Sequence, residues 1–270
     1  MKDVALLIGW LLLGVQTLDA QVLKPSRKIA TVNVQGVTRV SVDRLGNFYF
    51  VLGDGAIVKY DPDGKELARY TASQTTPLTL LEAWNPLRVF AYYRDRQEYR
   101  TLDRFLTEQA VAPLDPAFAI DPYLMCPSID NNGWILDTSD LSLKKVNLSG
   151  AIVMLDFMLK LSGVPESPEF VHMREYQNMV FLLDRKSGLY VLNNIGKQID
   201  FIEAVGVNAF AFSGEDLYYQ EGDRLRFIDL YTKETHEVQL EGIPLFTLAT
   251  DERLVVVREK EAVFYEFANP

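Results

Sequence analysis

Short apolar runs alternate with turn-forming residues along most of the chain. Residues 37–70 contain four such runs, at 37–42, 48–52, 56–60 and 65–70, separated by segments rich in Gly, Asp, Asn and Pro. Runs of β-branched and aromatic residues bounded by these turn residues predict strands joined by hairpins. Residues 37–70 therefore predict one four-stranded, up-and-down sheet.

The same pattern recurs along the chain. Further copies span 77–111, 123–155, 169–203 and 208–240, and a last copy over 245–267 has only three strands. An Asp or Asn ends the third strand in five copies, at intervals of 42, 44, 46 and 36 residues. These residues are Asp61, Asp103, Asn147, Asn193 and Asp229. A period near 42 residues with four strands per unit is typical of a β-propeller, and about 250 residues make six such units.

The segment ahead of the first copy supplies the strand that the last copy lacks. Residues 28–34 read KIATVNV, a short apolar-alternating run. We expect this strand to complete the last blade and close the ring, which hides an open sheet edge. The predicted fold is an all-β, six-bladed propeller of four-stranded blades, in one domain over residues 21–270. A two-sheet sandwich is the alternative, but a sandwich requires no 42-residue period.

Two phrases of the first repeat resemble six-bladed propellers of the NHL and TolB-like kind. They are SVDRLGNFY at 41–49 and IVKYDPDGK at 57–65. The resemblance spans roughly residues 28–267. It implies a ring in which the first strand of each blade lines a central channel, and it implies a fold rather than an activity.

Residues 1–20 have the pattern of a secretory signal. Lys2 precedes a nearly continuous apolar run from Val4 to Val15, and Ala20 offers a small residue for cleavage. The run is about 12 residues, and a spanning helix needs roughly 20. We expect an exported bacterial protein, periplasmic or associated with the outer membrane, whose mature chain does not span a membrane. An uncleaved membrane anchor is the alternative.

Composition narrows the classes of partner and cofactor. The chain has 27 Lys and Arg against 37 Asp and Glu, a formal net charge of -10, which argues against nucleic acid as a partner. Its single cysteine, Cys126, cannot form an intrachain disulfide, and its two histidines cannot make a His-rich metal site. We expect no cofactor.

Polar residues near the ends of the predicted first strands are the candidates for chemistry at the channel mouth. Among six-bladed propellers that are enzymes, secreted lactonases hold a divalent cation there with Glu, Asn and Asp oxygens. Such residues are also common in turns for their backbone hydrogen bonds, and we predict neither a metal site nor a catalytic set. His172 lies on a predicted inner strand and is typical of a structural hydrogen-bonding group. The candidates are Asp43, Glu82, Asn85, Asp130, His172, Glu175, Asn208 and Asp251.

Residues 110–122 and 156–168 interrupt the repeat. Inserted loops on a rigid ring often carry function. The segment from Asp156 to Leu161 is largely apolar and predicts a short helical turn. Its side chains would form a protein-binding patch if exposed, and would cover the ring if tucked inward. They are Phe157, Met158, Leu159 and Leu161.

These observations favour an exported, non-catalytic propeller. We expect it to bind a protein partner in the cell envelope, as a scaffold or as an accessory subunit of an envelope or membrane complex. One alternative is a metal-dependent lactonase or hydrolase, which requires at least three of the candidate side chains to converge within reach of one metal. A receptor for a sugar or peptide fragment is a further alternative.

Overall fold

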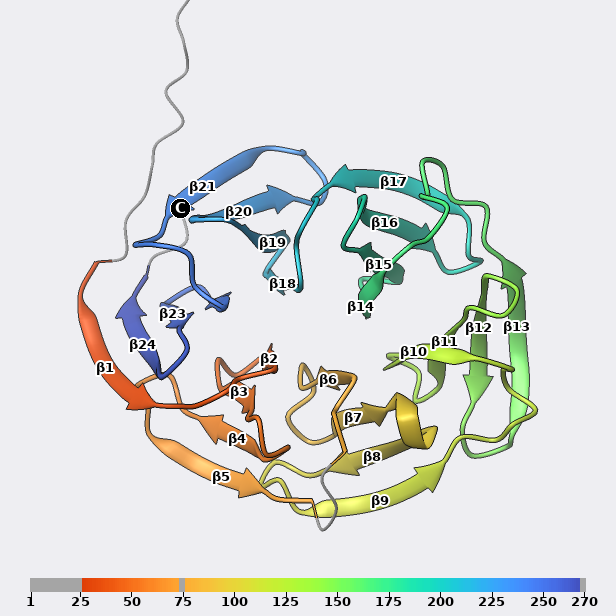
Figure 1. Ribbon diagram of the computed structural model, residues 1–270, viewed down its shortest axis with the longest axis horizontal. Helices are drawn as coiled ribbons and strands as arrows, with labels where there is room; N and C mark the ends of the chain where they lie inside the picture. The colour runs from red at the N-terminus through yellow and green to blue at the C-terminus, as the bar shows by residue number, and fades with distance from the viewer. Residues whose placement is uncertain (1–25, 73–75, 268–270) are drawn as a thin grey trace, which may run out of the picture.

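Six four-stranded antiparallel sheets surround a central channel (Figure 1). The computed structural model describes residues 26–72 and 76–267, so the predicted signal segment 1–20 lies outside the described residues. In five sheets the strands follow chain order from the channel outward, and in the sixth the strand from the N-terminus lies outermost. The predicted all-β, six-bladed propeller with its N-terminal closure is confirmed.

Each blade runs from a first strand at the channel to a fourth strand at the rim. Blade 1 contains β2 (Arg39–Val42), β3 (Phe48–Val51), β4 (Ile57–Tyr60) and β5 (Glu66–Tyr70). Blade 2 contains β6 (Leu80–Glu82), β7 (Val89–Tyr93), β8 (Glu98–Leu102) and β9 (Glu108–Pro113). Blade 3 contains β10 (Pro122–Pro127), β11 (Gly133–Asp137), β12 (Ser142–Asn147) and β13 (Ile152–Met158). Blade 4 contains β14 (Phe170–Tyr176), β15 (Met179–Asp184), β16 (Gly188–Asn193) and β17 (Gln198–Glu203). Blade 5 contains β18 (Phe210–Ser213), β19 (Asp216–Glu221), β20 (Arg224–Asp229) and β21 (Thr235–Gln239). Blade 6 contains β22 (Phe246–Ala249), β23 (Arg253–Val257), β24 (Glu261–Glu266) and β1 (Lys28–Asn33).

The second strand of each blade forms the core between blades. Every residue of β3, β7 and β11 is buried, because neighbouring blades cover both faces of these strands. Two buried tyrosines on second strands also bond to the first strand of the next blade. Tyr92 donates to the carbonyl of Pro122, and Tyr218 donates to the carbonyl of Ala249 at 2.9 Å. This burial on both faces explains why the sequences of these second strands are almost continuously apolar and do not alternate between apolar and polar residues.

The Asp or Asn that marks the repeat organises the turn after the third strand in blades 1 to 5. Asp61 Oδ1 accepts hydrogen bonds from the amides of Asp63 at 3.0 Å and Lys65 at 2.8 Å. Asp103 and Asn193 accept in the same way from the amides two and four residues later. A short acceptor side chain at this position replaces backbone bonds that the tight turn leaves unmade. This local requirement explains the regular spacing of these residues.

The segment of residues 156–161 differs from the sequence expectation. The predicted helical turn is wrong, because β13 continues to Met158 and pairs with β12 as far as Ser142. Within the described residues the one helical element is the 3₁₀ turn η1 (Arg94–Arg96). In that same part of the chain, no helix is long and apolar enough to cross a membrane.

The N-terminal strand joins the two ends of the ring. β1 pairs antiparallel with β24, from Lys28 opposite Tyr265 to Asn33 opposite Glu261. Next to this pairing, the ring of Phe264 packs edge-on against Phe48 of blade 1, with centroids 5.6 Å apart. Both phenylalanines are fully buried. The junction thus combines a hydrogen-bonded ladder with an apolar contact to the next blade.

We expect Phe264→Ala to lower the free energy of unfolding by about 3–5 kcal/mol, because it empties the core at the junction. The control is Phe105→Ala, whose side chain is exposed and should cost less than about 0.5 kcal/mol. Denaturant unfolding followed by tryptophan fluorescence measures both. Equal losses for the two variants would contradict a tightly packed junction.

Candidate functional site

The channel opens at two mouths that carry different side chains. The starts of the first strands line a cavity of about 520 Å³, which we call the N-terminal mouth. Thr38, Arg39, Thr79, Tyr123 and His172 are among its residues. The ends of the first strands border a cavity of about 380 Å³ at the other side, which we call the C-terminal mouth. Arg44, Trp84, Asn85, Ile129 and Tyr176 are among its residues.

An ion pair crosses the channel between the two mouths. Arg174 of β14 donates from Nε to Glu82 of β6 at 3.0 Å, and the two side chains are only 4% and 8% exposed. Their blades are not neighbours, because blade 3 lies between them. Above this pair, Trp84 packs edge-on against Tyr176 with centroids 5.7 Å apart. Blades 2 and 4 therefore contact each other directly through the channel.

The guanidinium of Arg174 is enclosed by aromatic rings. Its central carbon lies 5.2 Å from the centroids of Trp84 and Phe212 and 5.7 Å from that of Tyr176. Such cation–π contacts compensate part of the cost of removing the cation from water. The Nη2 atom is buried and has no hydrogen-bond partner among the described residues. Arg174 thus holds one unused donor at the centre of the channel.

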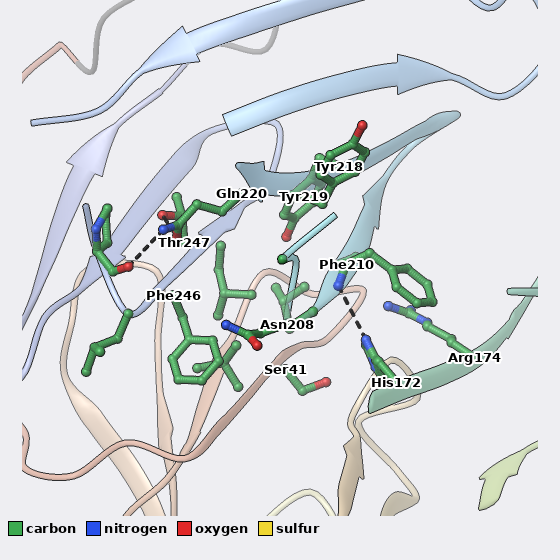
Figure 2. A pocket seen from close by; sticks show the side chains of 18 of the residues that line it. Ser41, His172, Arg174, Asn208, Phe210, Tyr218, Tyr219, Gln220, Phe246 and Thr247 are labelled. Atoms are coloured by element: carbon green, nitrogen blue, oxygen red, sulfur yellow. Dashed lines mark hydrogen bonds between the residues drawn. The ribbon is translucent and has the colours of Figure 1, made fainter. Parts of the chain in front are cut away.

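An inner chamber of about 280 Å³ extends from Arg174 toward the N-terminal mouth (Figure 2). We define it by Ser41, Glu82, His172, Arg174, Asn208 and Phe246. It shares His172, Asn208 and Phe246 with the cavity of the N-terminal mouth. The chamber is therefore continuous with that mouth, while Glu82 and Arg174 separate it from the C-terminal mouth.

His172 faces this chamber as a neutral imidazole. Its Nδ1 accepts a hydrogen bond from the amide of Phe210 at 3.3 Å, drawn in Figure 2, and the two rings lie 4.5 Å apart. Burial lowers the pKa of His172 to about 3, with the positive charges of Arg174 and Arg39 acting in the same direction. Because Nδ1 is an acceptor, the single proton of the neutral ring sits on Nε2.

Most of the predicted candidates have structural partners of their own. Asp43 is buried in the turn after β2, where it accepts hydrogen bonds from the amides of Leu45 and Asn47 and from the hydroxyl of Tyr49. Burial and the contact with Asp43 raise the pKa of Tyr49. Lys59 lies 3.6 Å from the same carboxylate. Asp43 therefore ties the first three strands of blade 1 together.

Other candidate carboxylates and amides also have hydrogen-bond or ion-pair partners within the protein. Glu175 accepts from the Trp134 indole at 2.6 Å, Asp130 pairs with Lys145 at 2.6 Å, and Asp251 accepts from Ser213 at 2.7 Å. Asn85 accepts from the amide of Leu87. His172 and Asn208 lie at the N-terminal mouth, and Glu82 alone among the other six candidates lines a cavity with them.

No group of three or more His, Cys, Asp or Glu side chains within 26–72 and 76–267 is arranged to hold a metal ion. Cys126 is fully buried, which raises the pKa of its thiol.

The predicted protein-binding side chains do not form one exposed patch. Leu159 is buried, and Leu161 packs against the core of blades 2 to 4. Phe157 is half-buried against Gly196 of blade 4, which leaves Met158 as the one well-exposed member. The structure instead exposes neighbouring residues of the same outer strand. We call the set Ile152, Val153, Met154 and Met158 the β13 edge.

Ile152, Val153 and Met154 were not among the residues predicted from the sequence. They lie in the run AIVML at 151–155, where the sequence pattern predicts the fourth strand of the copy over 123–155. The signal in the sequence was the absence of charged residues among these apolar ones, because the fourth strands β5, β9 and β17 contain charged residues. Arg174 was missed as well, since nothing near it in sequence marks it as the partner of Glu82.

No protein-family model matches the sequence, and no curated protein is similar to it in sequence. Solved structures do share its fold. A streptogramin B lyase aligns with a TM-score of 0.57 at 10% identity, covering 90% of this chain and 89% of that one. Virginiamycin B lyase from Staphylococcus aureus aligns with a TM-score of 0.56 at 12% identity, covering 88% and 98%. The WD40 domain of Pan2 from Neurospora crassa aligns with a TM-score of 0.61 at 9% identity, covering 92% and 98%.

These similarities show the propeller fold alone. The matched proteins include enzymes and a WD40 domain, so the shared fold does not distinguish catalysis from binding. The finer likeness to the NHL and TolB-like kind stays a prediction. Any functional inference must come from the side chains of the channel and of the outer strands.

We expect Glu82→Gln to lower the free energy of unfolding by about 3–5 kcal/mol, because it leaves the buried Arg174 without its counter-charge. The matched control is Glu66→Gln, which breaks the exposed 2.9 Å pair with Arg69 and should cost less than about 1 kcal/mol. Urea titrations measure both variants. Similar small losses would show that the channel pair does not connect blades 2 and 4 energetically.

The depressed pKa of His172 predicts a stability that depends on pH. Above pH 6.5, the ordinary pKa, the ring is neutral in both states and the full stability is present. As the pH falls toward 3, His172 becomes protonated in the unfolded chain but stays neutral in the folded protein, so the free energy of unfolding decreases. The loss relative to His172→Gln should reach at most about 1.4 kcal/mol per pH unit. Unfolding of both proteins at pH 7 and at about pH 4.5 tests this, and a difference that does not change between them would contradict it.

Proposed function

We propose that the protein is an exported, non-catalytic propeller that binds another protein in the bacterial cell envelope, as a scaffold or accessory subunit. The observation that carries this proposal is the apolar, exposed edge of blade 3. Side chains of the β13 edge stand out from the rim of the ring, with Ile152 58% and Met158 70% exposed. Exposed apolar clusters of this kind are typical of interaction sites.

The other outer strands are protected in ways that β13 is not. The sequences of β5, β9, β17, β21 and β1 are ELARY, EQAVAP, QIDFIE, THEVQ and KIATVN. Each carries a charged residue at or near its start, and β9 ends in proline, features that discourage pairing between edges. β13 reads IVMLDFM and has Asp156 as its single charged residue. It is the strand of the rim best suited to accept a partner.

The proposed mode of binding is addition of a strand. β13 bonds to β12 on one side only, so the outward backbone groups along its edge are free of sheet partners. An extended segment of the partner can hydrogen-bond to them as a fifth strand of blade 3. Apolar side chains on that segment would cover the β13 edge. The partner segment should therefore be extended and apolar.

The alternative of a metal-dependent hydrolase has less support. It requires acidic and amide side chains to converge within reach of one metal. Glu82, Asn85 and Glu175 do line one cavity at the C-terminal mouth. Their oxygens, however, already accept from Arg174, from the amide of Leu87 and from the Trp134 indole. The lyase structures share the fold at 10% and 12% identity, which transfers no active-site residue. Binding at the rim requires no such convergence.

A photo-crosslinking amino acid at Ile152 tests the proposal in the native cell envelope. We expect it to capture one protein reproducibly, and the adduct to fall at least about tenfold when Met154 is also changed to Lys. The same amino acid at Leu67 of β5 should not capture this protein.

Leu67→Lys is the matched control for Met154→Lys, because both side chains are 49% exposed on outer strands. Both variants should keep the wild-type unfolding free energy within about 0.5 kcal/mol. Loss of the adduct in both variants, or equal capture from both labelled positions, would overturn the assignment of the β13 edge.

A further inference from the structure

The inner chamber of the channel presents several hydrogen-bond donors, alongside the Asn208 amide and the Tyr219 hydroxyl, which can donate or accept. Nη2 of Arg174 is buried without a partner among the described residues, while Nε is used by Glu82. Glu82 is occupied at both oxygens, because Oε1 accepts from the amide of Trp84 at 2.8 Å. An unsatisfied buried donor is costly, and an acceptor brought by a ligand would remove that cost.

Two further donors face the same space. His172 has its proton on Nε2, since Nδ1 accepts from the amide of Phe210. Ser41 Oγ accepts from the amide of Ala83 at 3.1 Å, which leaves the hydroxyl proton to donate. Figure 2 shows Ser41, His172 and Arg174 around one cavity. A ligand that satisfies them must carry several acceptor lone pairs.

Three arginines line the N-terminal mouth together with two carboxylates, although the chain as a whole is acidic. They are Arg39, Arg94 and Arg185, with Asp95 and Glu169. Arg39 donates to the carbonyls of Thr38 and Thr79, and it makes no ion pair within the described residues. Burial and the nearby charge of Arg185 lower the pKa of Arg39. Arg185 itself is paired with Glu169. Arg94 is likewise paired with Asp121, so Arg39 is the cation of the mouth that an entering anion would meet.

The chamber is also partly apolar. Phe210, Phe246, Val40 and Leu248 line it alongside the donors. Its volume of about 280 Å³, extended by the mouth, is near the lower range of small-molecule sites. A phosphate dianion could use these donors, but it has no apolar part to place against the hydrocarbon wall. A carboxylate on an apolar body fits both parts.

We propose that the inner chamber binds a small organic monocarboxylate. The carboxylate accepts hydrogen bonds from the guanidinium of Arg174 and from His172 and Ser41, and its apolar body points past Phe246 toward the N-terminal mouth. This site is independent of the β13 edge. It assigns the channel a ligand-binding role in addition to the proposed protein-binding role of the rim.

Calorimetric titration of the full chain with benzoate tests the proposal. We expect saturable binding of one benzoate per chain, and at least about tenfold weaker binding of benzamide, its neutral isostere. Inorganic phosphate is the third probe and should bind more weakly than benzoate. The absence of saturable benzoate binding up to about 10 mM, or equal binding of benzamide, would overturn the proposal. Tighter binding of phosphate would overturn the carboxylate assignment.

Variants locate the benzoate within the chain. The double substitution Glu82→Gln with Arg174→Gln removes both buried charges together and should weaken benzoate at least about tenfold. Because this variant can fail to fold, Ser41→Ala and Arg39→Gln provide milder tests, each expected to weaken benzoate by about two- to fivefold. Arg69→Gln on the outer strand β5 is the matched control and should leave binding unchanged. Unchanged affinity in both milder variants would overturn the assignment of the chamber.

Discussion

The pairing of β1 with β24 is the interaction on which the rest of the structure depends. Each blade has an apolar second strand that must be covered on both faces, so a row of blades is stable only if its two ends meet. β1 brings the start of the chain to the last sheet, and Phe264 then packs on Phe48 of blade 1. Arg253 of blade 6 adds an ion pair with Asp63 of blade 1 at 3.0 Å. Opening this junction would expose sheet edges and apolar side chains at two blades together.

A closed ring also determines what the channel can contain. The first strands are held close together, so side chains from blades that are not neighbours can meet across it. Glu82 and Arg174 do so, and they separate the inner chamber, which is continuous with the N-terminal mouth, from the C-terminal mouth. Buried ion pairs of this kind often add little net stability because of the cost of desolvation. This pair instead fixes the position of the Arg174 guanidinium and leaves its Nη2 atom without a hydrogen-bond partner among the described residues.

We propose two kinds of recognition on one scaffold, one at the rim and one in the channel. The rim presents backbone groups and apolar side chains of β13, which suit an extended protein segment. The chamber presents hydrogen-bond donors on a hydrocarbon wall, which suits a small acceptor-rich molecule. Lyases and a WD40 domain share this fold at 9% to 12% sequence identity. The fold therefore permits several functions, and specific side chains determine which one a given protein has.

The repeat, the number of blades and the closing strand followed from the sequence alone, because each depends on local physics. Asp61 accepts hydrogen bonds from the amides two and four residues later, and this local turn ends the strand before it. The contacts of Glu82 with Arg174, the neutral state of His172 and the exposure of Met154 were decided only by the tertiary structure. They depend on how blades distant in sequence approach one another, and on strand pairing that extends β13 where a helical turn was predicted. Local hydrogen bonds depend on a few consecutive residues, whereas burial and charge pairing across the channel depend on the closed ring.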